Sequence, residues 1–452
     1  MINAAPPNNG GVNARQKVAI ICPFLKSERQ DPGIVDYLQA EAVGLAQAIN
    51  LEVSFVKNVV IDRPKPSTLL RGGFLDELKT DLISQDIALV YIDKAITPIQ
   101  QRNLEKQLKA KVIDRTGLIL EIFGARASTF EGRLQVELAA LSYQKSRLVR
   151  SWTHLERQRG GFGFLGGPGE SQIELDRRMI IQKIVRLKAD LEKVKKTRML
   201  HRKSRQKVPY PVVALVGYTN AGKSSLFNKL TGADTFVKDL LFATLDPTMR
   251  LVALPSGKKV ILSDTVGFIS QLPTHLVAAF RATLEEVIEA DVIVHVRDLV
   301  SPMWDEHANV VLQVLSDLGI AFPHPTKQFI EVFNKIDLIA SNEQMQATSS
   351  LVEQGIRCVT SAVTGQGLEA LLGRIDDCLK GKSIRMTLLV SHEEGGVMAW
   401  LHENGVVHAK KSCEDGIIFD ISFDEKVYSR GLRKITKWTR NEKNERQKIN
   451  HG

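Results

Sequence analysis

The stretch GYTNAGKS, residues 217–224, matches the pattern G-x-x-x-x-G-K-[ST] in full. It follows the apolar run VVALVG and precedes SLFNKL, an order that predicts a strand, a phosphate-binding loop and a helix. In such a loop the backbone N–H groups wrap the phosphates, Lys223 reaches the β- and γ-phosphates, and Ser224 binds Mg²⁺. We therefore expect a nucleoside triphosphate to contact Gly217, Tyr218, Thr219, Asn220, Ala221, Gly222, Lys223 and Ser224.

A second motif, D-x-x-G, ends the strand-like run KVILSDTVG. Asp264 would hold Mg²⁺ through water, and Gly267 would sense the γ-phosphate. The segment LFATLDPT lies between the two motifs and is the expected switch loop, with Thr244 as the second hydroxyl on Mg²⁺ and Thr248 as its rival. The predicted catalytic residues are Lys223, Thr244 and Gly267, and the remaining nucleotide contacts of this region are Phe242, Ala243, Leu245, Asp246, Thr265 and Val266.

A third strand-like run, QFIEVFNKID, ends in Asn334 and Asp337. Guanine presents two adjacent donors that one carboxylate can accept, whereas adenine presents an acceptor beside a donor. N-K-x-D alone also fits a capped turn, but after the two earlier motifs Asp337 predicts selection of guanine. The expected ligands are thus GTP and GDP with Mg²⁺, the expected reaction is hydrolysis of GTP, and further base contacts are Lys335, Ile336, Ser361, Ala362 and Val363.

Phe268 follows D-T-V-G at the position where Ras-like enzymes carry a glutamine that orients the attacking water. A phenyl ring cannot orient a water, so intrinsic hydrolysis should be slow. Acceleration must come from a partner, a reordered switch loop or an ion. Asn220 sits where some GTPases bind K⁺ beside the phosphates, which makes K⁺ stimulation a hypothesis, and Gln271 is an alternative replacement for the glutamine.

The composition of the chain fits a soluble multidomain protein. Its 452 residues suffice for two or three domains, and 43% are hydrophobic. The longest apolar runs fall far short of the ~20 residues that a membrane span needs. The four cysteines, Cys22, Cys358, Cys378 and Cys413, are scattered and indicate reduced thiols. We expect a cytoplasmic monomer without a membrane span.

The elements around the motifs predict an α/β protein with six segments. Strand-like and helix-like runs alternate from Lys17 to about Thr129, as in KVAIICPF, DYLQAEAVGLAQAI and LEVSFVKNVV, which argues for a parallel α/β sheet. The segments are a disordered lead-in (1–16), an N-terminal α/β domain (17–133), a helical hairpin (134–207), a Ras-like P-loop GTPase domain (208–382), a small α+β domain (383–432) and a basic tail (433–452).

The hairpin is predicted from two heptad-like runs that flank a glycine-rich stretch. Leu134, Leu138 and Leu141 begin the first run, and the second contains Ile180, Ile184, Leu187, Leu191 and Val194. Two ordinary core helices would show nearly the same spacing. Between them, GGFGFLGGPG (160–169) contains G-x-G-x-x-G, but no strand precedes it, so a dinucleotide fold is excluded.

Positive charge is concentrated in the hairpin. Residues 141–207 contain 18 Lys and Arg against 6 Asp and Glu, whereas the whole chain has a net charge of +10. The rest of the chain is therefore slightly acidic. Such local basicity predicts a polyanionic partner, nucleic acid before membrane, although a solvated helix surface is the simpler alternative.

The order of these motifs resembles a translation-factor-class GTPase, and two longer stretches resemble the HflX family of ribosome-associated GTPases. These stretches are QRNLEKQLKAKVIDRTGLILEIFGARASTFEGRLQVELA and GGPGESQIELDRR. The resemblance covers about Lys17 to Lys382 and is weaker beyond. In one departure, LLRGGFLDEL, read as a loop, has only Arg71 where the family carries a basic Gly-Lys-Gly-like stretch, which argues against a separate nucleotide or RNA role there.

The resemblance implies binding to the large ribosomal subunit and its rRNA, and splitting of stalled ribosomes, notably in heat stress. The glycine-rich tip would then enter the peptidyl-transferase region. Arginines would pair with rRNA phosphates, and glycines would allow close backbone approach. A GTP-switched adaptor for another RNA or protein is the alternative function. The expected RNA contacts are Arg157, Arg159, Gly160, Gly161, Gly163, Gly166, Gly167, Arg177 and Arg178.

Overall fold

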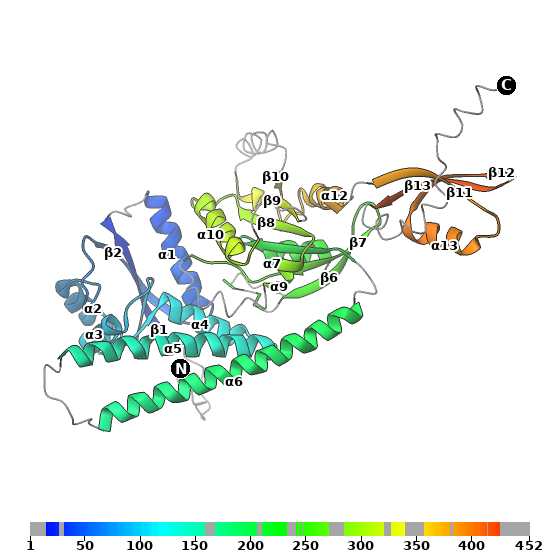
Figure 1. Ribbon diagram of the computed structural model, residues 1–452. Helices are drawn as coiled ribbons and strands as arrows, with labels where there is room; N and C mark the ends of the chain where they lie inside the picture. Colours follow the sequence, from blue (N-terminus) through cyan, green and yellow to red (C-terminus); the bar gives the residue numbers. More distant parts are fainter. Residues whose placement is uncertain are drawn as a thin grey trace, which may run out of the picture. The chain divides into compact units, whose positions relative to one another are not determined.

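The computed structural model describes most of the chain, coloured along the sequence in Figure 1. The described residues form two compact units, which divide between Leu371 and Leu372. The structure describes residues 15–26, 31–158, 168–205, 210–232, 241–242, 244–245, 247–270, 284–320, 327–339, 357–379, 383–413 and 415–424.

The first unit begins with a parallel four-stranded sheet in the order β2-β1-β3-β4. Residues of the central strand β1 alternate between two cores, since Val18 and Ile20 pack in one cluster and Ala19 and Ile21 in the other. A sheet with both faces covered explains the uninterrupted apolar runs. The elements are β1 (Lys17–Leu25), α1 (Pro32–Gln47), β2 (Glu52–Ile61), α2 (Gly72–Ser84), β3 (Leu89–Ile92), α3 (Pro98–Leu108), β4 (Lys111–Asp114) and α4 (Arg115–Arg126).

The expected loop at LLRGGFLDEL was wrong from Gly72 onward, where helix α2 begins. Leu75, Leu78 and Leu82 follow one another at steps of three and four residues, and all three are buried in the N-terminal core. Burial of this stripe outweighs the helix-weakening glycines at its start. Arg71 stands just before the helix and pairs with Asp62.

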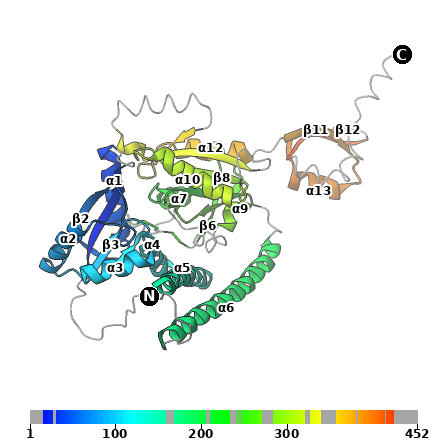
Figure 2. The ribbon, with the colours of Figure 1, turned by 60° about the vertical axis from the view of Figure 1, so that its left-hand side comes forward.

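The helical hairpin consists of α5 (Phe130–Gln158) and α6 (Pro168–Arg205), which lie side by side in Figures 1 and 2. Its contact contains the residues expected from the heptad spacing, from Leu134 and Leu141 on α5 to Ile184, Leu187 and Leu191 on α6. Helix α5 starts earlier than expected because Thr129 Oγ1 accepts a hydrogen bond (2.9 Å) from the Gly132 N–H.

The domain that carries the nucleotide motifs is built on a six-stranded sheet in the order β10-β9-β8-β5-β7-β6, in which β6 is the one antiparallel strand among those described. The carboxyl ends of β5, β7 and β9 carry Gly217, Asp264 and Asn334, so the three motifs meet at one edge. The elements are β5 (Val212–Gly217), α7 (Lys223–Thr231), β6 (Thr248–Ala253), β7 (Lys259–Asp264), α9 (Glu285–Glu289), β8 (Val292–Asp298), α10 (Trp304–Asp317), β9 (Gln328–Asn334), η2 (Ile336–Leu338) and β10 (Arg357–Val359).

Helix α12 (Leu368–Leu379) crosses the boundary between the two units. The second unit contains an antiparallel sheet in the order β11-β13-β12, with α13 packed on it. The predicted fold class, a parallel α/β domain, a basic hairpin, a P-loop domain and a small α+β domain, is confirmed. Within the described ranges, no helix is long and apolar enough to cross a membrane. The elements of this unit are β11 (Ser383–Val390), α13 (Gly395–Asn404), β12 (Val406–Cys413) and β13 (Gly416–Asp424).

Candidate functional site

The phosphate-binding loop runs from the end of β5 into α7, as the sequence indicates. Lys223 is buried, and its Nζ donates hydrogen bonds to the carbonyl oxygens of Gly217 (3.1 Å) and Tyr218 (2.7 Å). Burial lowers the pKa of Lys223 to about 8, although nearby Asp264 favours the charged form. The ammonium group is thus held under the loop that would wrap the phosphates.

Three oxygen-bearing side chains meet beside Lys223. Asp264 Oδ2 accepts hydrogen bonds from Ser224 Oγ (2.7 Å) and Thr244 Oγ1 (2.8 Å), and these two hydroxyls lie 2.8 Å apart. Thr248, the rival to Thr244, is exposed at the start of β6. Burial raises the pKa of Asp264. Its Oδ1 is buried without a hydrogen-bond partner in the described part of the chain.

This metal corner, defined as Ser224, Thr244 and Asp264, suits a hard cation. Hydroxyl and carboxylate oxygens are ligands that Mg²⁺ accepts, and Mg²⁺ usually completes its shell with water and phosphate oxygens. The unpartnered Asp264 Oδ1 is left to accept a hydrogen bond from a metal-bound water. No cluster of three or more His, Cys, Asp or Glu was found among the described residues that could hold a metal alone.

Asn334 joins the phosphate loop to the base-binding loop. Its Nδ2 donates to the Ala221 carbonyl (3.0 Å), while its Oδ1 accepts from the Ala362 N–H (3.0 Å) and from Thr360 Oγ1 (3.3 Å). The side chain packs so closely that a Cβ on Gly222 would lie 2.2 Å from Nδ2. The asparagine of one motif therefore requires the glycine of the other.

A cavity of about 440 Å³ opens between these loops. Asp337 lines it, and its Oδ1 has no hydrogen-bond partner among the residues that the structure describes, as expected of a group kept for a ligand. Lys335 Nζ donates to Asp298 Oδ2 (2.9 Å), which holds the motif's lysine along the wall. Ala362 and Val363 also line the cavity, and Ser361 Oγ accepts from the Thr364 N–H (3.0 Å).

The D-x-x-G segment is pinned to the phosphate loop by backbone bonds. The Phe268 N–H donates to the Gly217 carbonyl (3.1 Å), and the Phe268 carbonyl accepts from the Thr219 N–H (2.7 Å). The Phe268 ring is buried in the core, so it does not face a substrate water. Gly267 lies close to Lys223, since a Cβ there would be 3.1 Å from Nζ. Gln271 lies outside the described residues.

Several expected contacts turn their side chains into the core instead of the cavity. Tyr218 is buried, stacks on His307 with ring centroids 3.7 Å apart, and donates through its hydroxyl to Ser270 Oγ (2.9 Å). Only backbone groups of these residues remain available to a nucleotide. The side chains of Phe242, Leu245, Val266 and Ile336 are also buried. Thr265 Oγ1 donates to the Leu215 carbonyl. Ala243 and Asp246 lie outside the described residues.

Sequence reasoning missed one wall of the cavity. Helix α1 of the N-terminal domain contributes Tyr37, Glu41 and Gly44 to the lining. Glu41 is buried and pairs with Arg115 at 2.6 Å, and Arg115 also pairs with Asp93 at 2.6 Å. No sequence motif includes these residues, and they lie far before the phosphate loop in the chain.

The expected RNA contacts are only partly described. Arg177 and Arg178 are exposed on α6. The side chain of Arg157 and the residues Arg159, Gly160, Gly161, Gly163, Gly166 and Gly167 lie outside the described residues.

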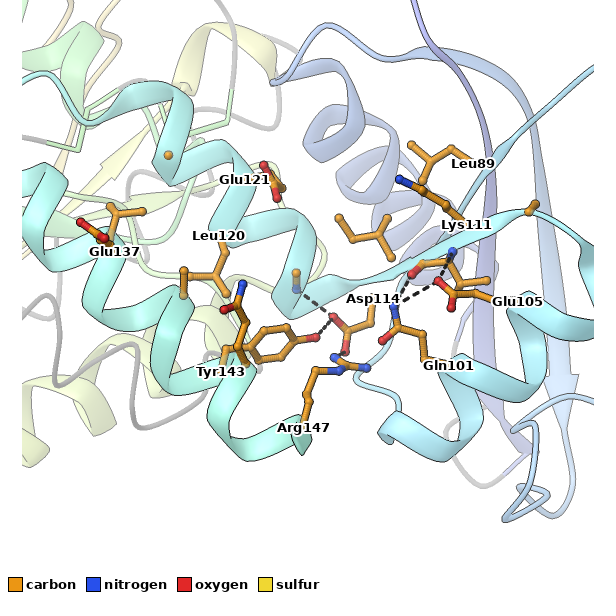
Figure 3. A pocket seen from close by; sticks show the side chains of 18 of the residues that line it. Leu89, Gln101, Glu105, Lys111, Asp114, Leu120, Glu121, Glu137, Tyr143 and Arg147 are labelled. Atoms are coloured by element: carbon orange, nitrogen blue, oxygen red, sulfur yellow. Dashed lines mark hydrogen bonds and ion pairs between the residues drawn. The ribbon is translucent and has the colours of Figure 1, made fainter. Parts of the chain in front are cut away.

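A second cavity, of about 780 Å³, lies beside the edge strand β4 in the N-terminal domain (Figure 3). Asp114 faces it and accepts hydrogen bonds from Tyr143 Oη (2.6 Å) and Arg147 Nη1 (3.2 Å), both on α5. Gln101 Nε2 of α3 donates to the Val112 carbonyl (2.7 Å), and Glu105 Oε1 of the same helix accepts from the Val112 N–H (3.2 Å). These bonds satisfy backbone groups on the free edge of β4. The two bonds to Asp114 fasten the hairpin to the domain, and no residue of the nucleotide motifs lines this cavity.

Comparisons with known proteins agree with this arrangement. Four families match in sequence order: "GTP-binding GTPase N-terminal" at residues 37–124, "GTP-binding GTPase Middle Region" at 126–205, "50S ribosome-binding GTPase" at 212–335 and "HflX C-terminal domain" at 348–445. A GTPase HflX of Magnetococcus marinus is 48% identical over 375 residues, which cover 83% of this chain and 85% of the relative. A GTPase HflX of Escherichia coli K12 is 42% identical over 355 residues, covering 78% and 82%. One of Caldanaerobacter subterraneus is 46% identical over 407 residues, covering 89% and 90%.

Proposed function

The chain belongs to the HflX family of GTPases, and on that premise we propose that it couples its GTP cycle to binding of the large ribosomal subunit and to dissociation of stalled ribosomes. It binds GTP and is a GTP hydrolase. The ribosomal role rests on a strongly basic hairpin in a chain that also carries the nucleotide motifs. The family description "50S ribosome-binding GTPase" for residues 212–335 supports the same target.

Each motif has a role in the proposed reaction. Asp337 accepts two donors of guanine, Lys223 binds the β- and γ-phosphates, and Gly267 senses the γ-phosphate through its backbone. Ser224 and Thr244 would hold Mg²⁺ directly and Asp264 through water, and the ion would neutralise phosphate charge. The remaining proposed contacts are the backbone groups of residues 217–222, 242–246, 265–266, 335–336 and 361–363.

Acceleration of hydrolysis is assigned to the ribosome. The Phe268 ring is buried, so it cannot orient the attacking water. Without that group the isolated chain should hydrolyse GTP slowly, and the ribosome would reorder the switch segment or supply the missing group. K⁺ beside Asn220 is a second source of acceleration, because a cation there would neutralise charge between the phosphates.

The hairpin is the proposed rRNA-binding element. Residues 141–207 carry 12 more positive than negative charges, and Arg177 and Arg178 are exposed on α6. Arginines at these positions and at 157 and 159 would pair with rRNA phosphates, while the glycines of 160–169 would allow close backbone approach. We propose that the protein acts as a cytoplasmic monomer, partly bound to ribosomes.

The test measures binding of the full chain to purified large subunits at several salt concentrations. Wild type should bind with an affinity that falls steeply as salt rises, and Arg177→Glu/Arg178→Glu should weaken binding and flatten the slope. Lys26→Glu/Lys94→Glu, which changes as much charge in the N-terminal domain, is the matched control. If the hairpin variant binds like the control, the hairpin is not the rRNA-binding element. That result would favour the alternative function, a GTP-switched adaptor for another RNA or protein.

A further inference from the structure

The switch segment packs against the N-terminal domain. The Phe242 ring is buried and meets Phe123 of α4 edge to face, with ring centroids 4.7 Å apart and planes at 78°. Leu241 lies against α1, since a Cβ added to Gly44 would be 3.1 Å from Leu241 Cδ1. Phe242 and Leu245 belong to the same core cluster as Phe123. This segment is therefore anchored outside the GTPase domain that uses it.

Phe242 also adopts a backbone conformation that a phenylalanine seldom takes. Its φ is +57°, in the left-handed region that favours glycine and asparagine. Such residues persist only where the surroundings over-determine them, and they gather at functional sites. Here the ring makes an edge-to-face contact with Phe123, which lies in another domain.

Thr244 lies only two residues after Phe242. Two residues span at most ~7 Å, so the place of the Phe242 ring limits where the Thr244 hydroxyl can go. That hydroxyl lies in the metal corner, bonded to Asp264 Oδ2 and Ser224 Oγ at 2.8 Å each. The anchored ring and the metal-corner hydroxyl are thus two ends of one short segment.

We infer that Phe123 is a positioning residue for the nucleotide reaction, which acts through Phe242 to hold Thr244 at the metal corner. Contacts to Mg²⁺ and the γ-phosphate order such switch segments, and GDP lacks the γ-phosphate. A segment already held in place loses less freedom when GTP binds. The N-terminal domain thereby favours GTP over GDP. The inference rests on the proposed metal role of Thr244.

The test compares affinities of the full chain for a fluorescent non-hydrolysable GTP analogue and for fluorescent GDP. Phe123→Leu keeps an apolar side chain but removes the ring pair. It should weaken analogue binding about three- to tenfold, the value of one aromatic pair, with GDP affinity within about twofold of wild type. The Mg²⁺ concentration for half-maximal analogue binding should rise, a change that a general loss of stability does not produce.

Leu78→Ala is the control, because Leu78 is equally buried but belongs to the other core of the N-terminal sheet. A double variant with Phe242→Leu should show no further loss, since both changes break one contact. An unchanged analogue-to-GDP ratio in folded Phe123→Leu, or an equal shift in Leu78→Ala, would overturn the inference. If Phe123→Leu does not fold, Gly44→Val displaces Leu241 from the other side and must lower the same ratio.

Thr244→Ala separates this inference from the proposed function. If it lowers the analogue-to-GDP ratio and Phe123→Leu does not, only the positioning role fails. If Thr244→Ala leaves the ratio unchanged, the metal role of Thr244 fails, and the positioning role fails with it.

Discussion

Asn334→Asp removes one donor at the point where the phosphate loop meets the base-binding loop. The carboxylate keeps the acceptor for the Ala362 N–H but faces the Ala221 carbonyl with an oxygen, where the amide Nδ2 donated at 3.0 Å. The Asn334 side chain is 1% exposed, so the unpaired carbonyl gains no water. An unsatisfied buried group costs about 1–3 kcal/mol, and the added charge raises the cost to about 2–4 kcal/mol.

For a domain of this size, the loss lowers the melting temperature by about 5–15 °C. The assay is thermal unfolding of the full chain with and without GDP, which identifies the transition that nucleotide stabilises. GDP affinity should fall as well, because both loops move apart. Asn103→Asp is the matched control, since Asn103 Nδ2 also donates to a backbone carbonyl, of Ser67 (2.9 Å), but at an exposed site.

The reasoning is refuted if Asn334→Asp shifts the GDP-responsive transition no more than Asn103→Asp does, with unchanged GDP affinity. That result would mean that the two loops hold their places without the asparagine.

Further predictions concern Lys223, the base pocket, the K⁺ hypothesis and the contact between the hairpin and the N-terminal domain. Lys223→Ala should abolish GTP binding. In the wild type, the pKa of Lys223 is lowered to about 8, so the free chain loses this positive charge above that pH. Lys223 must then regain a proton to bind phosphate. GDP affinity should therefore fall by up to about tenfold per pH unit above pH 8 and stay level below it, and a flat profile to pH 9.5 would contradict this. Asp337→Asn should shift preference from guanine toward xanthine nucleotides, and full retention of GTP selectivity would show that the base pocket is misassigned. Hydrolysis should be faster in KCl than in NaCl if K⁺ binds beside Asn220, and equal rates would remove that site. Tyr143→Phe should cost about 1.5–3 kcal/mol by removing the hydrogen bond to buried Asp114, and faster amide exchange in α5 and β4 would report it.

The nucleotide motifs could be located from sequence because each is a short pattern at a strand end. Parallel strands bring their carboxyl ends to one edge, so Gly217, Asp264 and Asn334 had to meet. The contact between the hairpin helices could be predicted as well, since the heptad spacing alone assigned Leu134 and Ile184 to the buried faces.

The contribution of the N-terminal domain could not be foreseen in this way. Glu41 and Phe123 belong to ordinary amphipathic helices, and only the packing of α1 and α4 brings them to the cavity and the switch segment. The direction of the Tyr218 side chain was also hidden, because its ring stacks on His307 of α10, a helix with no nucleotide motif. Helix α2 was missed because LLRGGFLDEL was compared with a family loop, although Leu75, Leu78 and Leu82 have helical spacing.

Sucrose-gradient sedimentation of the full chain with large ribosomal subunits tests the central claim most directly. The chain should travel with the subunit when it carries a non-hydrolysable GTP analogue and should remain at the top of the gradient with GDP. A chain lacking residues 160–169 should still travel with the subunit but should fail to separate assembled ribosomes. If the protein stays at the top of the gradient in both nucleotide states, the ribosome is not its target, and the basic hairpin serves another polyanion.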